Sequence, residues 1–204
     1  IFVVNAGSSS LKYQLIDMEN EQVLCKGLCE RIGVTGAISH KTADGRTYVA
    51  DTDMPTHSEA FEAVVYAMTQ SDAKVIDSFD EVSAIGHRIV QGGAIFKGSC
   101  LITPKALQDI DDLGALAPLH NPAHVLAIKA CIKTFGTEKP QVAVFDTSFH
   151  QTMPEHVYMF ALPYEYYEKY GVRKYGAHGT SHHFVSDRCA VLENKDKKDL
   201  KIIT

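Results

Sequence analysis

The sequence of 204 residues lacks several features that would point directly to a class of protein. It has no tryptophan, and no apolar run approaches the roughly 18 to 20 residues that a membrane span needs. Its net charge of -5 argues against nucleic acid and against an anionic membrane as partners, because both attract a basic face. A hydrophobic fraction of 45% with 22% charged residues is instead typical of a globular protein with a buried core.

The spacing of the cysteines forms no recognisable framework. The five cysteines are an odd number, and only Cys25 and Cys29 lie close together. No second cysteine or histidine pair near them completes a zinc site. In "QVLCKGLCE" both fall on the same face of a predicted strand, where cysteine behaves as a small apolar residue. We therefore expect a reduced protein of the cytoplasm.

Short apolar runs separated by turn residues make up the first third of the chain. "IFVV", "YQLID" and "QVLCKGLCE" predict strands, and "ADGRT" predicts a further hairpin. Helical patterns follow: Thr56 and Glu59 form a capping-box signature, and Asn121-Pro122 resembles an N-cap with a first-turn proline. "VSAIGHRIVQGG" and "QVAVFD" predict buried strands. Antiparallel strands followed by alternating strands and helices predict an α/β fold with a mixed sheet.

The segment "NAGSSSLKYQLID" raises the question of phosphate binding. A phosphate loop needs close backbone approach, donor groups and positive charge, which Gly7, Ser8, Ser9, Ser10 and Lys12 supply. The Walker A pattern also needs a second glycine, then lysine and serine or threonine opening a helix. Here a strand-like alternation follows Lys12, so the segment is not a P-loop. On these residues alone, a plain hairpin turn and a phosphate cradle are equally good interpretations.

Two basic residues stand in unusual surroundings. "GHRIVQGG" places Arg88 inside an apolar run, and a charged residue in a buried strand is rare unless it is paired or faces a cleft. Arg88 could clamp a carboxylate or phosphate with two hydrogen bonds, or it could form a structural ion pair. "APLHNP" places His120 just before a predicted helix N-terminus, which attracts anions, although a histidine of the capping region explains the pattern equally well.

Two further candidates lie in the second half of the chain. Asp146 ends the apolar strand "QVAVF", at the edge where α/β sheets bind ligands, so we favour a functional role over turn capping. His178 lies in "YGAHGTSHH", where an imidazole can donate to an oxyanion or a phosphoryl group. No nucleophile elbow and no metal-ligand trio accompanies them. Phosphate donors, an arginine, histidines and an aspartate together suit phosphoryl transfer, which depends mainly on positioning and charge neutralisation.

The order of these motifs closely resembles the acetate kinase family. "NAGSSSLKY", "GHRIV", "APLHNP", "VFDTSFHQTMP" and "YGAHGTSH" follow one another along essentially the whole chain. The resemblance implies the superfamily of acetate and sugar kinases, heat-shock chaperones and actin, whose members have two ribonuclease-H-like domains closing over a cleft. It implies that residues 1–148 form the first domain, a mixed sheet flanked by helices with the phosphate loop. Residues 149–204 would then begin a truncated second domain.

The same resemblance implies an activity and a set of roles by position. The reaction is reversible phosphoryl transfer from ATP to acetate, giving acetyl phosphate and ADP, with Mg²⁺ as cofactor. The implied magnesium contact is Asn5. The implied contacts to the ATP phosphates are Ser8, Ser10 and Lys12. The implied catalytic residues are Arg88, which also binds the substrate carboxylate, Asp146, and His178 as transition-state stabiliser. The implied substrate cleft contains His120, with Val90 and Leu119 forming the apolar pocket for the methyl group.

The chain departs from the family pattern in three ways. Gln91 stands where the family usually has histidine, and Ala177 stands where many members have phenylalanine. A smaller side chain could widen the acyl pocket, so we expect acetate to be preferred and propionate to be accepted. Family members are also roughly twice as long. We therefore expect the second phosphate loop, the adenosine site and the contacts of a homodimer to lie mostly outside this chain, which alone should have little or no activity.

Three alternatives remain at this point. A kinase for propionate or another short-chain acid would differ only in the shape of its pocket. A non-catalytic nucleotide-binding module could use the same fold, but it would need no carboxylate clamp, so the combination of Arg88, Asp146 and His178 argues against it. An ordinary hydrolase would need a nucleophile that the sequence does not offer.

Overall fold

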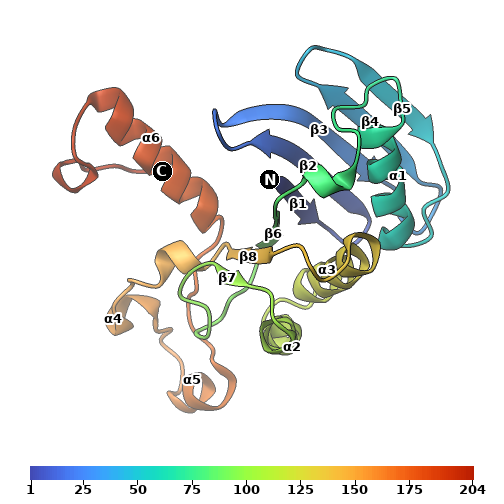
Figure 1. Ribbon diagram of the computed structural model, residues 1–204. Helices are drawn as coiled ribbons and strands as arrows, with labels where there is room; N and C mark the ends of the chain where they lie inside the picture. The colour runs from blue at the N-terminus through green and yellow to red at the C-terminus, as the bar shows by residue number, and fades with distance from the viewer.

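The computed structural model describes residues 1–204 and contains an eight-stranded mixed sheet (Figure 1). Its strands are β1 (Phe2–Ala6), β2 (Ser10–Asp17), β3 (Gln22–Glu30), β4 (Ala37–Thr42), β5 (Thr47–Asp51), β6 (Ile85–Ile89), β7 (Cys100–Leu101) and β8 (Gln141–Phe145), in the order β5-β4-β3-β2-β1-β6-β8-β7. Strands β1 to β5 form an antiparallel meander, whereas β6 is parallel to both β1 and β8. The prediction of an α/β fold with a mixed sheet is confirmed.

Helices follow the meander along the chain. They are α1 (His57–Thr69), α2 (Pro104–Asp112), α3 (Asn121–Phe135), α4 (Glu155–Tyr158), α5 (Glu165–Tyr170) and α6 (Gly179–Glu193), with short 3-10 turns η1 (Phe79–Glu81), η2 (Leu113–Ala115), η3 (Ser148–His150) and η4 (Lys197–Asp199). Helices α1 and α3 pack against one face of the sheet, whereas α4, α5 and α6 lie away from that face (Figure 1). Helix α1 begins with the predicted capping box. The side chain of Thr56 accepts a hydrogen bond from the backbone of the first turn, and the carboxylate of Glu59 accepts the N–H of Thr56 at 2.9 Å. None of the helices combines the length and apolarity that crossing a bilayer requires.

The start of α3 differs from the prediction. His120 is the residue before the helix, and Asn121 is already its first helical residue, with Pro122 next. The side chain of His120 makes no capping hydrogen bond. The amide of Asn121 does not cap the helix because it bonds instead to backbone groups of Gln91 and Ile110, far away in the sequence.

The core lies between the meander and helices α1 and α3. On β1, Phe2, Val4 and Ala6 are buried toward these helices, whereas Val3 and Asn5 point to the opposite face, as strand alternation requires. The buried side packs aromatic rings, such as Phe2 against Phe135, with centroids 6.0 Å apart. This packing fixes β1 and its neighbours rigidly from one side, and leaves the polar residues of the other face free for a ligand.

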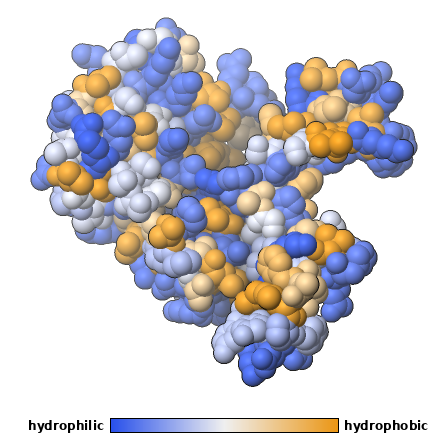
Figure 2. Space-filling view, turned by 180° about the vertical axis from the view of Figure 1, so that it is seen from behind, coloured by the Kyte–Doolittle hydropathy of each residue, from blue (hydrophilic) through white to orange (hydrophobic).

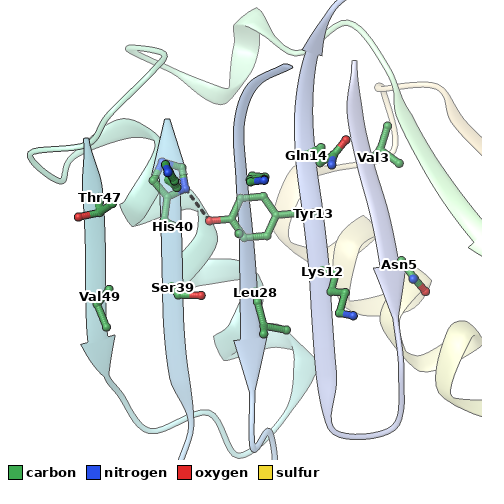
Figure 3. A pocket seen from close by; sticks show the side chains of 13 residues that line it. Val3, Asn5, Lys12, Tyr13, Gln14, Leu28, Ser39, His40, Thr47 and Val49 are labelled. Atoms are coloured by element: carbon green, nitrogen blue, oxygen red, sulfur yellow. Dashed lines mark hydrogen bonds between the residues drawn. The ribbon is translucent and has the colours of Figure 1, made fainter. Parts of the chain in front are cut away.

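A buried tyrosine crosses the sheet above a glycine. The hydroxyl of Tyr13 on β2 bonds to Nδ1 of His40 on β4 at 2.7 Å, passing over Gly27 on β3 (Figure 3). A Cβ on Gly27 would lie 2.4 Å from Cζ of Tyr13, so only glycine fits beneath the ring. Nε2 of His40 bonds in turn to the carbonyl of Ala73 at 3.1 Å, which ties the meander to the loop after α1.

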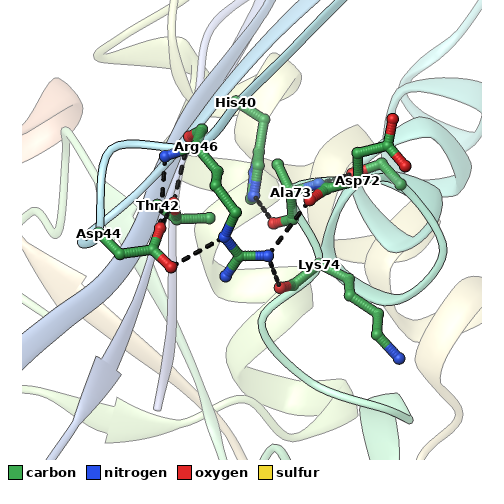
Figure 4. A network of polar contacts seen from close by, with 8 residues as sticks. His40, Thr42, Asp44, Arg46, Asp72, Ala73 and Lys74 are labelled. Atoms are coloured by element: carbon green, nitrogen blue, oxygen red, sulfur yellow. Dashed lines mark hydrogen bonds and ion pairs between the residues drawn. The ribbon is translucent and has the colours of Figure 1, made fainter.

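A polar network strengthens the same connection (Figure 4). Arg46 follows the predicted hairpin turn, and its Nη1 donates to the carbonyls of Asp72 at 3.2 Å and Lys74 at 3.1 Å. Its Nε donates to the carboxylate of Asp44 at 2.8 Å. The hairpin that connects β4 and β5 is therefore attached to the loop after α1 by side-chain bonds as well as by packing.

The face of the sheet opposite α1 and α3 is open. Two hollows lie on it, one of about 550 Å³ that includes Asn5 and Lys12, and one of about 500 Å³ that includes Asn5 and Arg88. Figure 2 shows a deep notch between the body of the sheet and the segment that carries α6. The side chains of Asn5 on β1 and Arg88 on β6 therefore line hollows that are open to solvent.

Candidate functional site

The ends of three neighbouring strands bring together an amide, a guanidinium and a carboxylate. Asn5 lies on β1, Arg88 lies on β6, and Asp146 directly follows β8. Nε of Arg88 donates to Oδ1 of Asp146 at 3.1 Å, and Nη2 donates to Oδ2 at 2.6 Å. Nη1 of Arg88 also approaches Oδ1 of Asn5 at 3.4 Å. The parallel order β1-β6-β8 places these residues side by side although they are far apart in sequence.

The two ends of this ion pair have different access to water. The side chain of Asp146 is 2% exposed, whereas that of Arg88 is 34% exposed. A buried carboxylate requires a charged or hydrogen-bonding partner, which the two parallel bonds from Arg88 supply. The pair is therefore anchored at Asp146, and its exposed edge is a guanidinium that can meet a ligand.

His178 approaches the same carboxylate from the start of α6. It precedes the helix with φ 53° and ψ 27°, a left-handed conformation that is uncommon outside glycine. Its Nδ1 lies 3.8 Å from Oδ2 of Asp146, and its side chain is 71% exposed. The next residue, Gly179, donates its N–H to the carbonyl of Asp146 at 2.8 Å. His178 is thus held beside the ion pair with its ring accessible to solvent.

Gly179 is a site residue that the sequence reasoning missed. A Cβ at this position would lie 2.3 Å from the carbonyl oxygen of Asp146 and 2.8 Å from Cβ of Phe149. The close approach of α6 to the end of β8 therefore requires glycine. The signal in the sequence is the glycine directly after His178 in "AHGTS". The reason for this glycine is the carbonyl of Asp146, which only the fold brings next to it.

The loop between β1 and β2 is a tight hairpin. The N–H of Gly7 donates to the carbonyl of Ser10 at 2.8 Å, and Ser8 and Ser9 are exposed at its tip. Nε2 of His57, at the start of α1, bonds to the carbonyl of Gly7 at 2.8 Å. Sequence reasoning missed this contact, since nothing near His57 in the sequence indicates the loop. The loop is a hairpin turn by geometry, and the exposed hydroxyls of Ser8 and Ser9 at its tip are accessible to an anion.

The predicted binding residues fall into neighbouring but separate hollows. Lys12 pairs with Asn5 in the β1–β2 ladder and lines the hollow on the open face (Figure 3). The residues that line a different groove, of about 1040 Å³, include Ser8, Ser10, Leu119 and His120. Leu119 is 81% exposed there. Val90 lines none of these hollows, so its predicted contact with a methyl group stays a prediction.

The residues present would suit magnesium only in part. No group of three or more histidine, cysteine, aspartate or glutamate side chains is arranged to hold a metal ion. The side-chain oxygens of Asn5 and Asp146 are of the type that Mg²⁺ prefers, and Mg²⁺ commonly keeps several waters and binds substrate phosphates besides one or two protein oxygens. These oxygens fit such a partial site, but not a cage made by the protein alone.

Comparison with known proteins identifies the family of the chain. The model of the acetokinase family matches residues 1–204. An acetate kinase of Methanosarcina mazei is 53% identical over 205 residues, which are 100% of this chain and 50% of that protein. An acetate kinase of Acetivibrio thermocellus is 52% identical over 205 residues, again 100% of this chain and 51% of that protein.

Solved structures give the same result. A crystal structure of Porphyromonas gingivalis acetate kinase matches with a TM-score of 0.90 and 42% identity, covering 96% of this chain and 49% of that one. A propionate kinase from Francisella tularensis matches with a TM-score of 0.87 and 40% identity, covering 96% and 49%. The chain thus spans about half the length of the curated relatives it matches.

Proposed function

Because this chain belongs to the acetokinase family, we propose that the protein carrying it transfers a phosphoryl group reversibly between ATP and acetate. The observation that supports this proposal best is the ion pair of Arg88 and Asp146, with Asn5 and His178 beside it. It presents a fixed guanidinium at a solvent-accessible strand end, which suits a small carboxylate as phosphoryl acceptor.

In the proposed reaction, Arg88 binds the carboxylate of acetate and directs one of its oxygens at the γ-phosphorus of ATP. A bond forms between that oxygen and phosphorus, and the bond from phosphorus to the β–γ bridging oxygen breaks, so ADP leaves with the electron pair. Lys12 and His178 can each donate to oxygens of the transferred phosphoryl group, over which negative charge is spread in the transition state. Asp146 orients Arg88 through two hydrogen bonds.

Residues of the same region would bind the nucleotide and the metal. The backbone of the hairpin after Asn5, with Ser8 and Ser10, would hold ATP phosphates, and Asn5 with Asp146 would offer oxygens to Mg²⁺. When bound, Mg²⁺ would supply charge neutralisation at the transferred phosphate. Leu119 and His120, the residues predicted for the substrate cleft, line the same groove as Ser8 and Ser10 of the hairpin.

We further propose that residues 1–148 are one domain and that residues 149–204 begin another. All eight strands of the sheet end by Phe145, and only α4, α5, α6 and two 3-10 turns follow. Since relatives are about twice as long, residues 1–204 alone should form little or no acetyl phosphate. A cytoplasmic location and a homodimer of the full-length protein belong to the same proposal.

The acid that the protein prefers is a separate question. The likeness to a propionate kinase structure makes propionate a second candidate, and the exposed Ala177 beside His178 leaves space for a longer acid. We propose that acetate is preferred and propionate accepted. Comparison of kcat/KM for the two acids decides between them, and a higher value for propionate would reverse the assignment.

The test of the activity is acetyl phosphate formation, measured as the hydroxamate, by a full-length protein and its variants. Arg88→Ala should lower kcat/KM for acetate by about 10²- to 10³-fold, the usual effect of removing one such charge-stabilising donor. Arg31→Ala is the matched control, because Arg31 also forms ion pairs but lies on the surface with Glu30 and Asp51. A full-length protein without acetyl phosphate formation, or equal losses in both variants, would contradict the proposal.

A further inference from the structure

Strands β1 and β6 separate where the site begins. Their parallel ladder extends from Phe2 opposite Ile85 to Val4 opposite His87. Beyond it, β1 leads into the hairpin of residues 7–10, which is proposed to hold phosphate, while β6 continues along β8, where the N–H of Asp146 still bonds to the carbonyl of Ile89 at 2.9 Å. The first residue after β6, Val90, therefore has an N–H on the side that β1 has left. A buried N–H of this kind needs another partner.

A histidine from α3 provides that partner. His124 is 4% exposed, and its Nε2 accepts the N–H of Val90 at 3.3 Å. An acceptor nitrogen carries no proton, so the ring is neutral and its proton lies on Nδ1. Nδ1 is buried and has no hydrogen-bond partner. Burial lowers the pKa of His124 to about 4, and the nearby carbonyl of Ala6, which favours a protonated ring, offsets only part of this effect.

A second residue of the same helix holds the next peptide group. Asn121 is fully buried, and its Oδ1 accepts the N–H of Gln91 at 3.2 Å. Its Nδ2 donates to the carbonyls of Gln91 at 2.9 Å and Ile110 at 3.0 Å. One turn of α3 thus satisfies three backbone groups of Val90 and Gln91, directly after the strand that carries Arg88.

We propose that Asn121 and His124 are positioning residues of the kinase site. They fix the end of β6 relative to the end of β1, and thereby set the distance between Arg88 and the phosphate hairpin after Asn5. Neither needs to touch a substrate, since each acts through main-chain groups. This inference rests on the proposed function, because the alignment of carboxylate clamp and phosphate loop matters only if a phosphoryl group passes between them.

The main test compares two buried histidines in a full-length protein. His124→Leu removes the acceptor for Val90, and we expect kcat/KM for acetate to fall by about 10²-fold, as misplacement of reacting groups by roughly 1 Å can cause. His40→Leu is the matched control, since His40 is also buried and also bonds a backbone group, but it lies on β4, three strands from β1. It should lower the melting temperature and leave kcat/KM within about twofold of the parent.

A milder pair of variants continues the test if His124→Leu does not fold. His124→Gln can place an oxygen near the position of Nε2 and should keep most of the activity. His124→Asn carries the same amide one methylene shorter, cannot reach Val90, and should lose about tenfold or more in kcat/KM. Equal values for the two, or a His124→Leu protein that loses only stability, would overturn the positioning role.

Hydrogen exchange separates this proposal from the proposed function. Peptides that contain residues 86–93 should lose protection in His124→Leu and in His124→Asn, but not in His40→Leu. This readout does not require catalysis. A parent protein that forms no acetyl phosphate would overturn the proposed function alone, whereas unchanged exchange of residues 86–93 would overturn the positioning role alone.

Discussion

Replacement of Arg88 by methionine tests the energetics of the site most directly, because it leaves the carboxylate of Asp146 buried without its partner. Removal of one member of a buried ion pair costs about 3–5 kcal/mol. Arg88 is 34% exposed, and Nδ1 of His178 remains 3.8 Å from the carboxylate, so we expect the lower end of that range, about 3 kcal/mol. For a chain of this size, that loss corresponds to a fall of about 6–12 °C in Tm.

The measurement is urea or thermal unfolding of Arg88→Met, Asp146→Leu and the double variant. Replacing both partners with apolar residues removes the unpaired charge, so the double variant should be more stable than Arg88→Met by about 1–3 kcal/mol. Arg31→Met, which loses only exposed ion pairs, should cost about 1 kcal/mol or less. A double variant as unstable as Arg88→Met would refute the reasoning, because the loss would then come from packing of the arginine stem.

Three further predictions concern single positions. Gly27→Ala should cost about 1–3 kcal/mol in urea unfolding, since the new Cβ would lie 2.4 Å from Cζ of Tyr13; a loss near zero would contradict the contact. Gly179→Ala should reduce kcat of a full-length protein by displacing His178, and unchanged kcat would argue against that placement. Burial lowers the pKa of His87 from 6.5 to about 4. Between pH 4 and 6.5, the unfolded chain therefore binds a proton at His87 that the folded chain does not bind. The free energy of unfolding should therefore fall as the pH decreases from 6.5 toward 4, by up to about 1.36 kcal/mol per pH unit. In His87→Gln the free energy of unfolding should fall less steeply over this pH range.

Features that depend on neighbours in the sequence could be predicted well. The capping box of Thr56 and Glu59 is present as expected, because both partners lie within one helical turn. The hairpin at "ADGRT" connects β4 and β5, since a short turn between two strand-like runs leaves few alternatives. The mixed α/β sheet follows from such local signals, taken in order along the chain.

Features that depend on distant partners could not. Asn121 was predicted to cap a helix, and this was wrong, because its amide bonds to Gln91, 30 positions away. Nothing in the sequence distinguishes His124 from an ordinary histidine in an apolar helix, because its partner Val90 is 34 positions away. The need for glycine at position 179 comes from the carbonyl of Asp146. In each case the constraint arises only when the parallel strands have been placed next to one another.

The sequence left Arg88 with two alternatives, a structural ion pair or a clamp for a ligand, and the geometry makes them compatible. A guanidinium has five N–H donors. Two of them bond to Asp146, and one approaches Asn5 at 3.4 Å, so two remain. Because Asp146 holds the guanidinium by one edge, the remaining donors keep a fixed direction at little further cost in side-chain entropy. The ion pair thus prepares Arg88 for the carboxylate of the proposed substrate.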